Sequence, residues 1–139
     1  SIRRQRQMCI RDRVYKEAMF QYYLKHVLRN KSKLKKKMSS DDPHGRAIYA
    51  HMWGVSEFEP TGTLKNFDRV ADLSKIQVPS LIVCGEYDEA TPKTSLRYAN
   101  RIEDCSFEVI QGASHSIWSE QPARIRRVIN AFLEKVVRS

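Results

Sequence analysis

The 139-residue sequence has too few cysteines to build a disulfide-stabilised domain. It contains three, Cys9, Cys84 and Cys105. Cys84 ends an apolar run and Cys105 lies in a polar segment, so the spacing matches neither a disulfide framework nor a zinc motif. The four histidines share no short metal-ligand pattern with cysteines or acids. We therefore expect no metal, and a reducing, cytoplasmic environment.

Long apolar runs and glycine-rich loops are absent as well. No run of about eighteen apolar residues occurs, which is the minimum for a membrane-spanning helix. The five glycines form no phosphate-binding loop. The sequence therefore predicts a protein that does not span a membrane and needs no cofactor.

The positive charge is concentrated in two places. Residues 3–13 resemble the in-frame translation of a sequencing adapter, and they have no apolar period and no capping residue. The other interpretation is a basic nucleic-acid-binding arm. Their five arginines against Asp12 account for four of the nine net positive charges. Most of the remainder lies in residues 25–37, whose lysine-rich half has no interleaved aromatics, as is typical of a solvated face. We expect no nucleic-acid partner and exclude residues 1–13 from the fold prediction.

The stretch that organises the chain is Gly85–Pro92. An apolar run over 79–84, bounded by proline and glycine, predicts a buried strand before it. Thr91 and Pro92 predict a helix start, with threonine as the N-cap. The next predicted strand, 107–110, is followed by Gly112 and His115. An acid after one strand and a histidine after the next match the last two members of a Ser…Asp…His order.

The helices are predicted from apolar spacing. Residues 14–29 have a broad apolar face, and 31–40 are expected to be helix end and loop. Asp42 and Pro43 predict a new helix that ends at Gly54, and a short helix is expected over 70–76. Another follows Pro92, and the last opens at Pro122 with one apolar stripe.

From Ser80 onward, strands and helices alternate, which predicts the closing part of a parallel α/β sheet. Parallel sheets need both faces covered, so we expect further strands upstream of Val14. The two helices before Gly54 are expected to form a lid on that body.

Three motifs resemble the proline iminopeptidase family of α/β-hydrolases. They are 52–58 (MWGVSEF), 61–68 (TGTLKNFD) and 85–92 (GEYDEATP). The resemblance covers about residues 14–136. It implies a C-terminal part of an α/β-hydrolase fold, with 14–66 as part of a helical cap and its connector and 67–139 as part of the core. The family usually has proline where Val55 stands and methionine after the histidine, where Ser116 stands.

The resemblance also implies roles for four residues. Asp88 would be the acid and His115 the base of a catalytic triad, while Glu57 and Glu89 would bind the free amino terminus of a substrate. The alternatives are a structural loop histidine, a capping aspartate and two surface glutamates, with Glu59 as the nearest misassignment. The aromatic residues Trp53, Phe58 and Phe67 fit a substrate pocket or a cap core equally well.

The expected whole protein is a serine aminopeptidase acting on peptides or amino-acid amides with a free N-terminus. An amidase or esterase on the same scaffold, or a non-catalytic binding protein, remains an alternative. The sequence contains no Gly-x-Ser-x-Gly elbow, which in this fold presents the nucleophile. We therefore expect the serine to lie outside this chain.

Overall fold

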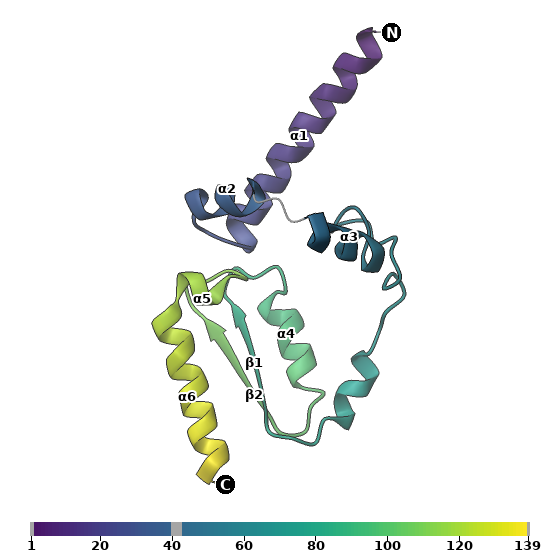
Figure 1. Ribbon diagram of the computed structural model, residues 1–139. Coiled ribbons are helices and arrows are strands. Elements are labelled where there is room, and N and C mark those ends of the chain that lie inside the picture. Colours follow the sequence, from purple (N-terminus) through teal and green to yellow (C-terminus); the bar gives the residue numbers. More distant parts are fainter. Residues whose placement is uncertain (1, 40–42, 139) are drawn as a thin grey trace.

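The computed structural model describes residues 2–39 and 43–138, with side chains from residue 11 onward. Its elements, in chain order, are α1 (Ile2–His26), α2 (Lys31–Ser39), α3 (Pro43–Met52), a short 3₁₀ helix (Val70–Lys75), β1 (Ser80–Gly85), α4 (Pro92–Ala99), β2 (Cys105–Ile110), α5 (Ile117–Glu120) and α6 (Pro122–Arg138). Figure 1 shows α1, α2 and α3 gathered beyond one end of the two strands, with α4 and α6 flanking those strands.

The two strands are parallel and paired along their whole length. Ser80 lies opposite Cys105, and Gly85 lies opposite Ile110. Helix α4 makes the crossover between them, which confirms the predicted strand, helix, strand order. Because parallel strands end at the same edge, the loops after Gly85 and Ile110 lie together there.

Apolar packing between β2 and α6 forms the core. Four buried residues make the cluster, with Val83, Val128 and Ile129 packed against it: Ile110, Ala113, Ile117 and Ile125. The predicted apolar stripe of the last helix therefore does cover the sheet. The apolar run of β1 is less buried than predicted, since Leu81, Ile82 and Val83 are only half-buried.

Thr91 caps α4 as the sequence predicted. Its hydroxyl oxygen accepts a hydrogen bond from the backbone N–H of Thr94 at 3.3 Å, and Pro92 occupies the first turn. This satisfies one of the N–H groups that a helix start leaves without a partner.

The prediction of helix end and loop was wrong for residues 31–39, because they form a separate helix, α2. The Asn30 side chain accepts a hydrogen bond from the backbone N–H of Lys33 at 2.9 Å, which is an N-cap that we had not recognised. Leu34 is buried to 1% exposure. One buried leucine and one N-cap are enough to stabilise α2, because its many lysines have a high helix propensity.

The boundaries of α1 and α3 also differ from the prediction. Helix α1 begins well before Val14 and ends at His26, so the backbone of the segment set aside from the fold prediction is helical. Once a helix has nucleated, each added residue costs little. Helix α3 ends at Met52, shortly before Gly54, whose φ of 136° suits glycine. The predicted cap Asp42 lies outside the described residues.

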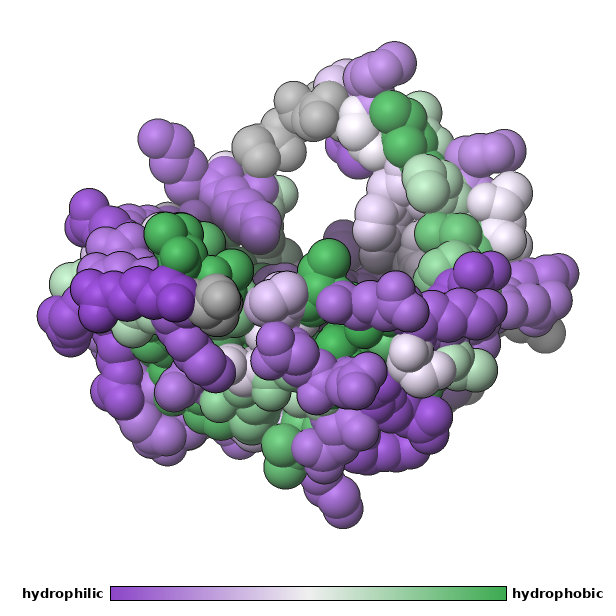
Figure 2. All heavy atoms as spheres, turned by 90° about the horizontal axis from the view of Figure 1, so that it is seen from below, coloured by the Kyte–Doolittle hydropathy of each residue, from purple (hydrophilic) through white to green (hydrophobic). Residues whose placement is uncertain are grey.

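Several large apolar side chains remain exposed, among them Val55, Phe67 and Trp118. Seen from the end opposite the helical cluster, the molecule is mainly hydrophilic with apolar groups interspersed (Figure 2). No helix in the described part of the chain has the length and apolar content to cross a bilayer.

Candidate active site

Asp88 is a buried carboxylate in the loop after β1. It is 4% exposed. Its Oδ2 accepts a hydrogen bond from the backbone N–H of Gly85 at 3.2 Å, and its Oδ1 accepts one from Ala90 at 3.0 Å. These two bonds fix the carboxylate against its own loop, so its position is set before any partner approaches.

His115 lies directly against this carboxylate. Its Nδ1 is 3.0 Å from Asp88 Oδ1. Because a carboxylate only accepts hydrogen bonds, the Nδ1 atom is assigned the proton, and Nε2 is left as the acceptor. The His115 side chain is 55% exposed. The structure therefore brings the predicted acid and base together, with the basic nitrogen free to take a proton.

The loops that carry Asp88 and His115 are in tight contact. A Cβ atom added to Gly85 would lie 2.4 Å from the carbonyl oxygen of Ser114, closer than carbon and oxygen atoms pack. Only glycine lets the end of β1 approach the histidine loop this closely.

The end of α1 supports the histidine loop from the other side. The backbone N–H of His115 donates to the carbonyl of His26 at 3.0 Å, and that of Ser116 donates to Val27 at 2.9 Å. Glu120 accepts from the Ser114 hydroxyl at 2.8 Å and from its backbone N–H at 2.6 Å. It also accepts from the backbone N–H of Arg29. The base is thus held by a helix far away in the sequence.

A cavity of about 600 Å³, here called the glutamate cavity, opens beside His115. It brings together side chains from α1, α2, α3 and the connector after α3, and both predicted glutamates lie in its wall. The lining residues are Tyr15, Met19, Tyr23, Val27, Leu34, Lys37, Met38, Tyr49, Val55, Ser56, Glu57, Glu89 and His115. Apolar and aromatic walls with a few polar groups are typical of small-molecule sites.

Glu57 is held by hydrogen bonds to both its side chain and its backbone. The Tyr23 hydroxyl donates to Glu57 Oε2 at 2.5 Å, and Trp53 Nε1 donates to the backbone carbonyl of Glu57 at 3.0 Å. The sequence predicts only a helix with a broad apolar face over residues 14–29, so it does not reveal this contact of Tyr23.

Glu89 has an altered acidity. Partial burial, and after it the negative charge of Glu57, raise the pKa of Glu89 above its usual value, while the positive charges of a protonated His115 and of Lys37, which also lines the cavity, lower it. The two carboxylates therefore repel each other across the cavity. A cation between them would relieve that repulsion.

The aromatic residues that the sequence left open lie outside this lining. Phe58 packs its ring against Tyr22, with ring centroids 5.5 Å apart. Phe67 is 68% exposed, and Trp53 supports the Glu57 backbone. Glu59, the nearest alternative to Glu57, is exposed and also lies outside the cavity.

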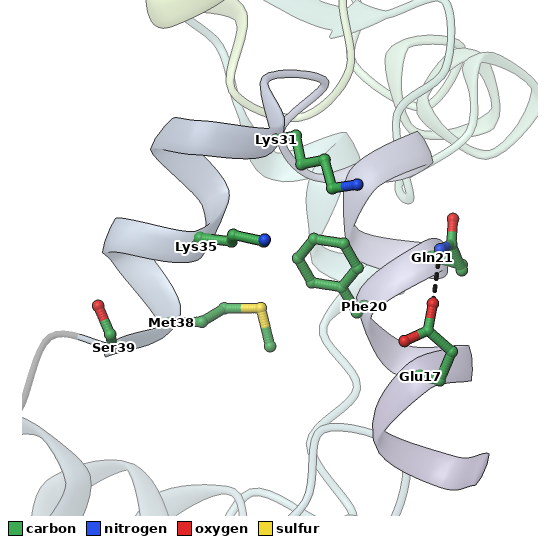
Figure 3. Close-up of a pocket in the computed structure, with 7 residues that line it drawn as sticks. All are labelled: Glu17, Phe20, Gln21, Lys31, Lys35, Met38 and Ser39. Atoms are coloured by element: carbon green, nitrogen blue, oxygen red, sulfur yellow. Dashed lines mark hydrogen bonds between the residues drawn. The ribbon is translucent and has the colours of Figure 1, made fainter. Parts of the chain in front are cut away.

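A second cavity of about 480 Å³ lies between α1 and α2 (Figure 3). The Phe20 ring points toward Lys35 and Met38 across it. Its only acid is Glu17, which already accepts a hydrogen bond from Gln21 at 2.7 Å. With no histidine and no acid pair, it lacks the groups that hydrolysis needs. Within the described residues, no cluster of three or more metal-ligating side chains occurs.

No protein-family model matches the chain, whereas individual known proteins do. A proline iminopeptidase from Heyndrickxia coagulans is 42% identical over 89 residues, which are 64% of this chain and 31% of that protein. The crystal structure of the Mycobacterium smegmatis proline iminopeptidase superposes with a TM-score of 0.73 at 29% identity, covering 96% of this chain and 45% of the other. The crystal structure of VinJ gives a TM-score of 0.72 at 31% identity, covering 88% and 42%.

The chain spans only 30–41% of the length of the curated relatives that it matches, which carry the name proline iminopeptidase. The structural matches confirm the fold class predicted from the sequence, the closing strands and helices of an α/β-hydrolase preceded by cap helices.

Proposed function

The chain is an α/β-hydrolase segment related to the proline iminopeptidases, and we propose that it carries the acid, the base and the amine-binding groups of a serine aminopeptidase. One observation carries this proposal. His115, hydrogen-bonded to Asp88, lies in the wall of the same cavity as Glu57 and Glu89.

The reaction would be acyl transfer from the first peptide bond of a substrate. A serine hydroxyl oxygen attacks the carbonyl carbon, and Nε2 of His115 takes the hydroxyl proton. The same proton then passes to the leaving amine as the carbon–nitrogen bond breaks. Water hydrolyses the acyl ester in a second round. Asp88 keeps the imidazole in the tautomer that makes Nε2 the base.

The serine is expected from a part of the protein outside this chain, since the 139 residues contain no Gly-x-Ser-x-Gly elbow. Activity tests therefore need the whole hydrolase. No cofactor is required for this chemistry.

The two glutamates would select a substrate with a free amino terminus. A peptide α-amino group has a pKa of about 7.7–8.0, so it is mostly a cation at neutral pH. Carboxylates bind such a cation through charge-assisted hydrogen bonds. Glu57 on the cap connector and Glu89 beside the triad acid would hold the amine one residue from the carbonyl that is attacked. The substrate would be a peptide or an amino-acid amide, with proline or another apolar first residue against the apolar wall.

A cytoplasmic location belongs to the same proposal, because Cys84 and Cys105 are both free thiols. Fractionation of cells that express the whole protein checks this point.

The experiment that tests the function removes the base and the acid separately. In the whole enzyme, His115→Ala should lose nearly all turnover of proline 4-nitroanilide. Asp88→Asn should lower kcat about 10⁴-fold, because the carboxylate that keeps the imidazole proton on Nδ1 is then gone, and Nε2 is no longer held as the base. Either variant keeping more than about a tenth of normal kcat would refute the triad role of that residue.

A further inference from the structure

We propose that Tyr23 is a positioning residue for Glu57, holding one oxygen of that carboxylate so that the other is left for the amino group of the substrate. This inference rests on the proposed function of Glu57 as an amine ligand.

The contact itself is short and lies at the site. The Tyr23 hydroxyl donates to Glu57 Oε2 at 2.5 Å, within the range of strong hydrogen bonds to a carboxylate. Both side chains line the glutamate cavity. Because Trp53 fixes the Glu57 backbone, the Tyr23 bond removes the remaining freedom of the side chain.

A tyrosine suits this position for an electrostatic reason. Glu57 and Glu89 repel each other, and a lysine or arginine at this place would neutralise Glu57 and compete with the substrate amine. A phenol donates a proton to Glu57 without bringing a full charge. Burial and the bond to Glu57 raise the pKa of Tyr23 far above its usual value. The hydroxyl therefore stays a donor wherever a serine hydrolase works.

Tyr23 also fixes the distance between the two halves of the site. It lies on α1 one turn before His26 and Val27, whose carbonyls accept the backbone N–H groups of His115 and Ser116. One helix thus contacts the carboxylate that binds the amine and the loop that carries the base.

The test is a double-mutant cycle on the whole enzyme with Tyr23→Phe, Glu57→Gln and both together. Each variant is assayed on proline 4-nitroanilide and on its N-acetyl counterpart. The matched control is Tyr22→Phe. Tyr22 is the preceding residue of α1; it senses the charges of Glu89 and Glu57 but does not line the glutamate cavity. The phenyl ring of Tyr23→Phe keeps the packing of the native ring, and equal melting temperatures verify this.

The expected result is a rise of about ten-fold in KM for the free-amine substrate in Tyr23→Phe, with kcat and the N-acetyl substrate changed little. In the Glu57→Gln background, the same change should alter KM by less than about two-fold. An unchanged or lower KM overturns the proposal. Equal losses on both substrates also overturn it, since they would show a general structural role. If Glu57→Gln itself does not discriminate between the substrates, the proposed amine-binding function fails first.

Discussion

At the scale of single residues, the candidate site consists of ionisable side chains that lie close enough to influence one another. Asp88 is fixed by two backbone N–H groups and orients His115. Glu57 and Glu89 face one cavity that Lys37 also lines; partial burial and then the negative charge of Glu57 raise the pKa of Glu89, while the positive charge of Lys37 lowers it. We propose that this pair of carboxylates favours a cationic ligand such as an amine.

The pH dependence of Glu89 follows from this. An amine cation needs the ionised carboxylate, so kcat/KM for a free-amine substrate should rise as the pH increases through the raised pKa of Glu89. It should fall again above about pH 8, where the amine loses its proton. A pH profile of kcat/KM on free-amine and N-acetylated substrates measures this. The Glu89→Gln variant should lose the rising limb specific to the free amine, and a limb that persists there contradicts the assignment.

Whereas kcat/KM should rise with pH, the contribution of Glu89 to the stability of the folded protein should fall as the pH rises. A carboxyl whose pKa is higher in the folded protein than in the unfolded chain favours folding below its unfolded pKa. That contribution is lost as the pH rises through the folded value. Glu89→Gln should therefore melt at a higher temperature than the native protein near neutral pH, and the gap should close in acid. If the difference in melting temperature between Glu89→Gln and the native protein did not change with pH, ionisation of Glu89 would carry no cost in folding free energy, which would contradict the raised pKa.

All four of these residues were predicted from the sequence, but by two different routes. Asp88 and His115 follow from strands whose ends must meet at one edge, a rule of backbone topology. Glu57 and Glu89 came from the resemblance of short motifs to a family. Tyr23 could not be found in either way, because its hydroxyl meets Glu57 only after the cap connector packs on α1.

At the scale of elements, the end of α1 contacts the two loops that follow β1 and β2 and so connects the cap helices to the core. Its last carbonyls accept from the histidine loop, and His26 Nδ1 lies 2.7 Å from the carbonyl of Tyr87 in the acid loop. The Arg29 guanidinium lies 4.1 Å from the centre of the Tyr87 ring, a cation–π contact. The loops that carry Asp88 and His115 therefore both contact the end of this helix.

Glu120 is the side chain that links the segment after α1 to the histidine loop, through its hydrogen bonds to Arg29 and Ser114. Glu120→Ala should leave the fully buried Ser114 without an acceptor for its N–H and hydroxyl groups, at a cost of about 1–3 kcal/mol in the free energy of unfolding. Urea unfolding of the whole protein measures the loss. The control is Glu134→Ala, an exposed glutamate on α6. A difference of less than about 0.5 kcal/mol between the two variants would contradict the role of Glu120.

Elements with strong local signals were predicted well, and α2 was not. Proline at a helix start and an apolar stripe marked α4 and α6 correctly. Helix α2 has a single buried residue, Leu34, and its lysines suggested a solvated loop. Its stability comes from the Asn30 cap and from packing against α1, and the packing is not visible in a local pattern.

At the scale of the whole molecule, the chain is proposed to carry only part of an active site. Its strands form a two-stranded sheet within the described residues, and each strand has an unpaired edge. We expect the 139-residue chain alone to show no aminopeptidase activity and to aggregate, which turnover and light-scattering assays measure. Turnover by the purified chain would overturn the view that the nucleophile lies elsewhere, and a monomeric chain with sharp cooperative unfolding would contradict the argument from open edges.

The proposed function depends on the two glutamates, since binding of the amine by them would distinguish an aminopeptidase from a general hydrolase. The most direct measurement compares kcat/KM of Glu57→Gln and Glu89→Gln in the whole enzyme on a free-amine substrate and on its N-acetylated counterpart. Losing one charged hydrogen bond costs about 1.5–3 kcal/mol, so each variant should lose about ten- to a hundred-and-fifty-fold on the free amine and little on the acetylated substrate. Equal losses on both substrates would contradict amine recognition and leave only an unspecified hydrolase.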